Sequence, residues 1–115
     1  MVTPVQHIHL HAAVIWVDGW HALVASAAEG RLRVTEIDRE AEPERDWFAR
    51  VARAADDCER LMILGPGTTP LAFEHAYAAL FRRSDRFVDA ETAAPVTERE
   101  LIDRLHQIDP DERRS

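Results

Sequence analysis

The sequence predicts one α/β domain with a mixed five-stranded sheet and helices on both faces. Two observations indicate this class: three strand-like segments come first, and helix-like and strand-like segments alternate after them. The 115 residues, 46% of them hydrophobic, suffice for one compact core and are too few for two. We therefore expect a single domain over residues 11–108, with an N-terminal arm at 1–10 and a charged C-terminal tail at 109–115.

The first three strands are expected to form a meander at residues 11–17, 21–27 and 31–37. HAAVIWV is apolar throughout, which is typical of a buried strand, and Asp18-Gly19 supplies turn residues before HALVASA returns. A second turn at Glu29-Gly30 leads into RLRVTEI, where apolar and polar residues alternate. That alternation predicts a half-exposed strand at a sheet edge.

Helical periodicity begins after the third strand. Residues 44–57 place Trp47 and its apolar neighbours on one face, and RLMIL at 60–64 reads as a central strand covered on both faces. Thr69 is expected to cap the next helix, with Pro70 at its first helical position.

The last third of the chain adds a strand and a helix. RFVDA at 86–90 is the expected fifth strand, and Thr97-Glu98-Arg99-Glu100 is a capping box that opens the final helix. The complete order is βββαβαβα, which ribonuclease H-like domains share with a few other α/β folds.

Charge narrows the classes of partner. The net charge is −7, all 14 basic residues are arginine, and residues 36–59 carry nine acidic residues. A surface this acidic opposes general binding of nucleic acid, so we expect a protein partner or a small ligand. No apolar run reaches the length of a membrane span and the N-terminus lacks the features of a signal peptide, so the expected location is the cytoplasm.

Three short motifs carry a resemblance to a known family. One strand ends in Trp16-Val17-Asp18, a later one ends in Gly65-Pro66-Gly67-Thr68, and a third leads into Glu91-Thr92, followed by Pro95 and Thr97. In this order they resemble the middle domain of archaeal and eukaryotic release factors and of Pelota. They are most similar to its small bacterial single-domain relatives, the "translational machinery protein" and host-attachment-like group.

The resemblance implies a ribonuclease H-like fold and a link to the translation machinery. Release factors carry a Gly-Gly-Gln tip between the third strand and the first helix, where this chain has only DREAEPE. Release activity is therefore not implied. The expected function is a non-catalytic binding or adaptor domain whose partner is a ribosome-associated component or another protein, with no cofactor.

The corner GPGTT is the first candidate site. A strand that leads through glycines to a helix N-terminus points backbone N–H groups at an anion, so Gly65, Gly67, Thr68 and Thr69 are candidate ligand-binding residues. The chain lacks the lysine that a phosphate-binding P-loop needs. The simpler interpretation is that the glycines relieve a tight corner. The alternative function is a small phosphate or nucleotide binder, or an enzyme, built on this corner.

A second group of residues is expected to contact a partner. Asp18, Trp20 and His21 surround the first turn, and we expect that turn to lie beside the GPGTT corner if their two strands are parallel. Trp20 is either a contact anchor or a side chain packed over the sheet edge. Arg82, Arg83 and Arg86 either stabilise a helix C-terminus or contact RNA. An open edge strand at 31–37 or 86–90 also allows a homodimer.

Other chemistries have weak support in the sequence. His7, His9 and His11 share one face of an extended segment, where two of them can chelate a metal ion opportunistically, with a third ligand from His21, His75 or His106. Glu36, Asp38 and Glu40 fall at the end of the third strand, away from the positions that a two-metal nuclease requires. Cys58 stands among acidic residues, which disfavour a reactive thiolate.

Overall fold

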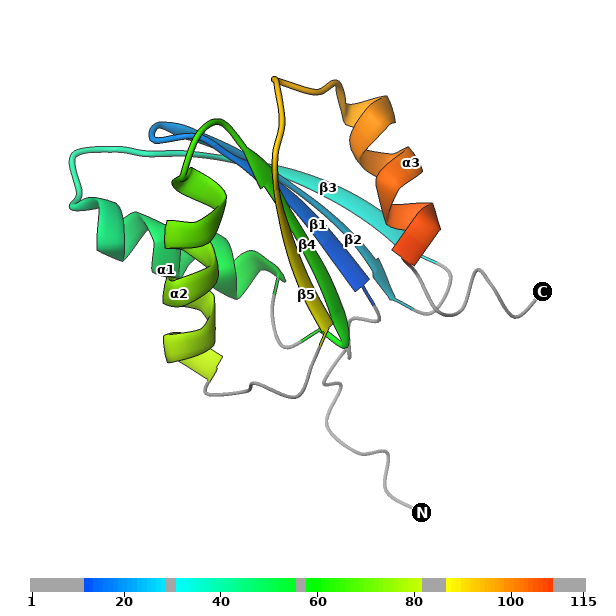
Figure 1. The fold of residues 1–115 in the computed structure, drawn as a ribbon, viewed down its shortest axis with the longest axis horizontal. Helices are drawn as coiled ribbons and strands as arrows, with labels where there is room; N and C mark the ends of the chain where they lie inside the picture. The colour runs from blue at the N-terminus through cyan, green and yellow to red at the C-terminus, as the bar shows by residue number, and fades with distance from the viewer. Residues whose placement is uncertain (1–11, 29–30, 56–57, 82–86, 109–115) are drawn as a thin grey trace, which may run out of the picture.

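A computed structural model describes residues 12–28, 31–55, 58–81 and 87–108, and contains three helices and five strands in those ranges (Figure 1). The elements follow the predicted order: β1 (Ala12–Val17), β2 (His21–Ala28), β3 (Arg31–Asp38), α1 (Glu44–Ala55), β4 (Arg60–Gly65), α2 (Thr69–Phe81), β5 (Phe87–Thr92) and α3 (Glu98–Ile108). The arm and tail predicted at the two termini lie outside the described residues.

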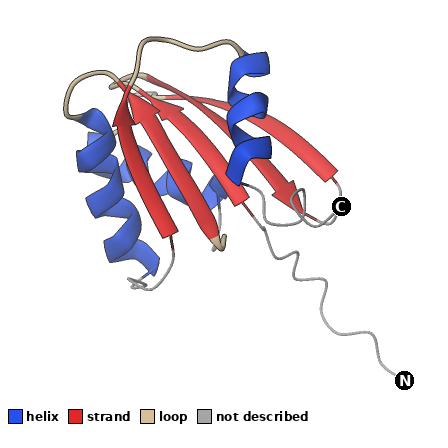
Figure 2. Cartoon of the chain, turned by 45° about the vertical axis from the view of Figure 1, so that its right-hand side comes forward, coloured by secondary structure: helices blue, strands red, loops and turns tan. Residues whose placement is uncertain are grey.

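The five strands lie side by side in one sheet (Figure 2), and their order is β3-β2-β1-β4-β5. β1 pairs antiparallel with β2, and β2 pairs antiparallel with β3. β1 also pairs parallel with β4, and β4 pairs parallel with β5. The sheet is therefore mixed, and the carboxyl ends of β1, β3, β4 and β5 all lie at one end of it.

Helices cover both faces of the sheet (Figure 1). α1 and α2 pack on one face around Ile15, Trp47 and Phe73, while α3 packs on the other around Leu64 and Leu101. β4 contributes Leu61 and Ile63 to the first core and Met62 and Leu64 to the second, because successive side chains of a strand point to opposite faces. This confirms the prediction of a central strand buried on both sides.

The edge of the sheet is also as predicted. Among the described strands β3 pairs with β2 alone, and all of its residues are exposed or half-buried, including Leu32 at 48% exposure. β5 forms the opposite edge. Dimerisation through either edge remains a prediction.

The predicted boundaries differ from the observed ones by one or two residues. α2 begins at Thr69 rather than at Pro70, and the Thr68 carbonyl accepts the hydrogen bond from the Ala72 amide, so the helix starts one residue early. β5 continues through Thr92, two residues beyond its predicted end, because Glu91 and Thr92 still pair with Leu64 and Gly65 of β4.

This strand order and helix arrangement make the chain a ribonuclease H-like α/β domain. No helix in the described ranges is long and apolar enough to cross a membrane.

Candidate functional site at the carboxyl end of the sheet

The turn after β1 and the corner after β4 lie side by side, as predicted. Parallel pairing brings Trp16 opposite Leu64, so the next residues, Val17 and Gly65, meet at the end of the sheet. A Cβ atom placed on Gly65 would lie 2.1 Å from the carbonyl oxygen of Val17. Only a glycine permits this approach without a backbone shift.

The GPGTT corner has a structural explanation for both of its glycines. Gly65 allows the close contact with β1, and Gly67 has a φ of 57°, which a residue with a side chain adopts only with strain. The corner is also tied to the end of β5: the Ala93 amide donates to the Gly65 carbonyl at 2.8 Å, and the Thr92 hydroxyl donates to the Gly67 carbonyl at 3.1 Å. Thr68 is exposed and Thr69 half-buried beside these bonds. Anion binding at this corner remains a prediction.

Asp18 shapes the first turn. One oxygen of its carboxylate accepts hydrogen bonds from the backbone N–H groups of Trp20 and His21, at 2.7 and 2.8 Å, and its own N–H donates to the His21 carbonyl. This is the side-chain turn that aspartate commonly forms, and it fixes the direction in which the next two side chains leave the backbone.

Trp20 projects from this turn and is 68% exposed. It does not pack into the sheet edge; instead the guanidinium of Arg39 lies 4.8 Å from the centre of its ring. Arg39 also donates through its backbone N–H to the Trp20 carbonyl, and through its side chain to the Gly19 and Glu42 carbonyls. An exposed indole held against a cation in this way is a suitable contact residue for a partner.

A second arginine organises the connection between β3 and α1. Arg50 donates to both carboxylate oxygens of Glu42, at 2.6 and 3.2 Å, and to the backbone carbonyl of Asp38 at 2.9 Å. The Arg50 side chain, followed by the backbone N–H of Glu40, holds the pKa of Glu42 below its usual value, and Glu42 in turn raises the pKa of Arg50.

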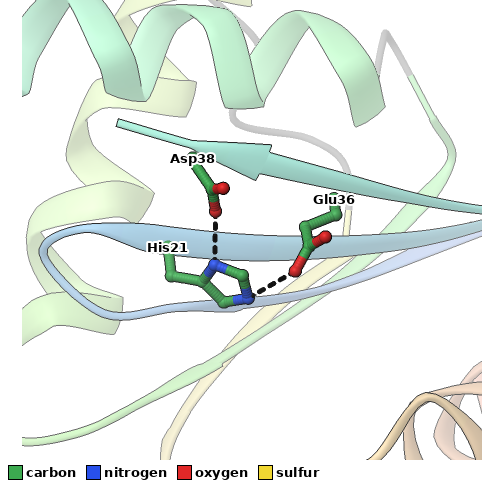
Figure 3. Close-up of side chains that lie close together, drawn as sticks. All are labelled: His21, Glu36 and Asp38. Atoms are coloured by element: carbon green, nitrogen blue, oxygen red, sulfur yellow. Dashed lines mark hydrogen bonds and ion pairs between the residues drawn. The ribbon is translucent and has the colours of Figure 1, made fainter. Parts of the chain in front are cut away.

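Three ionisable side chains from β2 and β3 form a cluster. The ring of His21 stands between two carboxylates, with Nδ1 2.5 Å from an Asp38 oxygen and Nε2 3.0 Å from a Glu36 oxygen (Figure 3). The His21 side chain is 37% exposed and the two carboxylates are 61% and 67% exposed. The three side chains form an open polar cluster rather than a buried ion pair.

Sequence reasoning missed this cluster. It placed Glu36 and Asp38 at the end of the third strand and His21 at the start of the second, without pairing them. Two residues separate β2 from β3, and a ladder that starts with Ala28 opposite Arg31 necessarily brings His21 opposite Asp38. Counting the register back from that short connection would have found the contact.

Two groups of predicted site residues lie outside the described residues. They are the arginines Arg82, Arg83 and Arg86 and the histidines His7, His9 and His11. Among the described residues, Asp18, Trp20 and His21 lie at the same end of the sheet as the GPGTT corner. Glu36, Asp38 and Arg39, which the sequence did not predict as part of this site, lie there too.

The fold is an α/β domain, and the candidate contact surface lies at the carboxyl end of its sheet. Among solved structures, Pelota from Thermoplasma acidophilum is similar, with a TM-score of 0.60 and 14% identity over 91% of this chain and 34% of that one. A chain in a model of ribosome-bound archaeal Pelota and ABCE1 has a TM-score of 0.55 and 16% identity over 88% of this chain and 33% of that one. An archaeal translation termination factor, aRF1, has a TM-score of 0.51 and 18% identity over 84% and 34%.

These likenesses establish the fold, and this chain spans about a third of each of these proteins. No protein-family model matches the sequence, and no curated protein matches it.

Proposed function

We propose that this protein is a translation-associated binding domain that contacts the ribosome or a translation factor. The observation that carries the proposal is the shared fold with Pelota and with an archaeal termination factor, over 84–91% of this chain, including a structure described as ribosome-bound. The sequence resemblance in the three strand-end motifs supports the same assignment.

The contact surface we propose is the turn surface, defined by Asp18, Trp20, His21 and Arg39. It joins an exposed indole to a guanidinium, an imidazole and one carboxylate, a combination suited to a polar protein or RNA–protein surface. Its backbone is held by the Asp18 turn and by Arg39, so little conformational entropy is lost when a partner binds.

The connection after β3 supports binding rather than hydrolysis. Only residues 39–43 separate β3 from α1, and they contain neither glycine nor glutamine. Within these residues, Arg39 and Glu42 are engaged in holding the connection to the first turn and to α1.

The proposal is tested by co-sedimentation of the purified chain with ribosomes from the source cells. We expect the wild-type chain to sediment with a ribosomal fraction and Trp20→Ala to weaken this at least about tenfold, as removal of a central aromatic contact typically does. Leu71→Ala is the matched control, because Leu71 is a comparably exposed apolar side chain, at 53%, on α2. Equal sedimentation of both variants would reject the turn surface as the contact.

A second variant examines the arginine group. Changing Arg82, Arg83 and Arg86 together to Glu tests the predicted RNA contact, and binding through them should also weaken as salt is raised. If the wild-type chain fails to sediment with any ribosomal fraction at low salt and no translation factor is recovered with it, the translation assignment is wrong.

A further inference from the structure

The His21 ring has a carboxylate oxygen beside each of its two nitrogens, that of Asp38 at Nδ1 and that of Glu36 at Nε2. A neutral imidazole carries one N–H, which donates to one of these oxygens, while the lone pair of its other nitrogen faces the second carboxylate. A nitrogen lone pair beside carboxylate oxygens is a donor set that a transition-metal ion takes up.

No arginine side chain pairs with these two carboxylates in the described part of the chain. The only side-chain partner recorded there for Glu36 and for Asp38 is the His21 ring. Arg50 donates to the backbone carbonyl of Asp38 rather than to its carboxylate, and Arg39 is directed to Trp20 and Gly19. With a neutral ring, the cluster is two negative charges around one imidazole.

We propose that His21, Glu36 and Asp38 form a binding site for a divalent transition-metal ion, with Zn²⁺ as the ion to test first. One potential ligand atom from each of the three residues lies within 4.8 Å of the others. Because the two carboxylates face different ring nitrogens, one of them must turn toward the nitrogen that the other faces before all three side chains bind one ion. An imidazole nitrogen with two carboxylate oxygens suits zinc and its neighbours in the first transition row, whereas Ca²⁺ and Mg²⁺ prefer oxygen alone.

The backbone presents these ligands from a fixed frame. His21 and Asp38 are directly opposite in the β2–β3 ladder and Glu36 lies two residues before Asp38, so all three point to the same face of the sheet. The Asp18 carboxylate holds the His21 amide, and Arg50 holds the Asp38 carbonyl. The two strand ends are thereby fixed before an ion arrives, which lowers the ordering cost of binding.

The site is open to solvent. All three side chains are at least 37% exposed, so three protein ligands would leave further coordination positions for water or for a group from a partner. The inference does not rest on the proposed link to translation, since a metal ion can occupy the cluster in the isolated chain.

The test is calorimetric titration of the full chain with ZnCl₂ at a fixed pH of about 7.5, where protons compete little with a metal ion for an imidazole nitrogen. Because His7, His9 and His11 can also bind zinc, the reference is a variant with these three changed to Gln. We expect it to retain one zinc per chain. Adding His21→Gln should weaken that binding at least about tenfold, and adding His75→Gln, an exposed histidine on α2, should leave it unchanged.

A second variant keeps the proposal testable if His21→Gln fails to fold. Glu36→Gln keeps the shape of the side chain and removes one anionic ligand, so the rise in Tm that zinc causes in the reference protein should disappear while the Tm without zinc stays close to the reference value. Zinc binding that survives both His21→Gln and Glu36→Gln, or that is absent from the reference protein, would overturn the proposal.

Discussion

Gly65→Ala tests the contact that holds the two halves of the candidate surface together. The new Cβ would lie 2.1 Å from the Val17 carbonyl oxygen and 3.4 Å from the Pro70 ring. Contacts below 3.0 Å are essentially not tolerated, so the ends of β1 and β4 must separate by about 1 Å. The Val17 oxygen is backbone at the end of a buried strand and cannot move aside as a flexible side chain would.

The expected cost is at the upper end of overpacking penalties, about 3 kcal/mol. For a chain of 115 residues, such a loss lowers Tm by roughly 10 °C and removes a large fraction of a typical stability of about 5–15 kcal/mol. The assay is urea-induced unfolding followed by far-ultraviolet circular dichroism, with thermal unfolding in parallel.

Two other glycines provide matched controls. Gly67→Ala meets no atom within 4 Å but must adopt a φ of 57°, so we expect a loss of about 1 kcal/mol. Gly19→Ala also meets no atom within 4 Å and should change stability by less than about 0.5 kcal/mol. If Gly65→Ala is no more destabilising than Gly67→Ala, the close approach of β1 and β4 is wrong.

Three further predictions concern single side chains. Thr97→Ala should lower the free energy of unfolding in urea by about 1 kcal/mol, because it removes one side of a capping box. The Thr97 hydroxyl accepts from the Glu100 amide at 3.1 Å, and the Glu100 carboxylate accepts from the Thr97 amide at 2.9 Å. An unchanged free energy of unfolding would exclude a contribution of this capping box to stability. Glu42→Gln should lower the urea midpoint at pH 7, because Arg50 lowers the pKa of Glu42 in the folded chain and so stabilises the fold while Glu42 is ionised. The effect should shrink as the pH falls below about 4.5, where Glu42 becomes protonated. A difference in urea midpoint between wild type and variant that is as large at pH 3 as at pH 7 would contradict this. Trp47→Ala should lower the free energy of unfolding by about 3–5 kcal/mol, because the side chain is fully buried. Trp47→Phe should change it by less than about 1 kcal/mol, because the buried indole nitrogen has no hydrogen-bond acceptor within the described residues and removing that nitrogen offsets part of the lost packing. Similar losses in both variants would refute this.

Local sequence signals were sufficient to predict the helices and strands and to predict which of their residues are buried. The apolar run of β4, the alternation in β3 and the stripe around Trp47 each depend on side chains a few residues apart, so their periods indicate type and burial directly. The capping box at Thr97 is equally local, and it is present with both of its hydrogen bonds.

The arrangement of the surface depended on contacts between distant segments. That Gly65 must be glycine follows from the position of the Val17 carbonyl 48 residues earlier in the chain, which no local pattern contains. The exposure of Trp20 was left open by the sequence, and the tertiary structure decided it by placing Arg39 over the indole ring.

The sequence by itself determined the class of fold, the order of its elements and the absence of the Gly-Gly-Gln motif, because hydrophobic period, turn residues and motif content are properties of neighbouring residues. Only the tertiary structure brought His21 between Glu36 and Asp38, since this contact arises from the pairing register of two strands and the face that their side chains share.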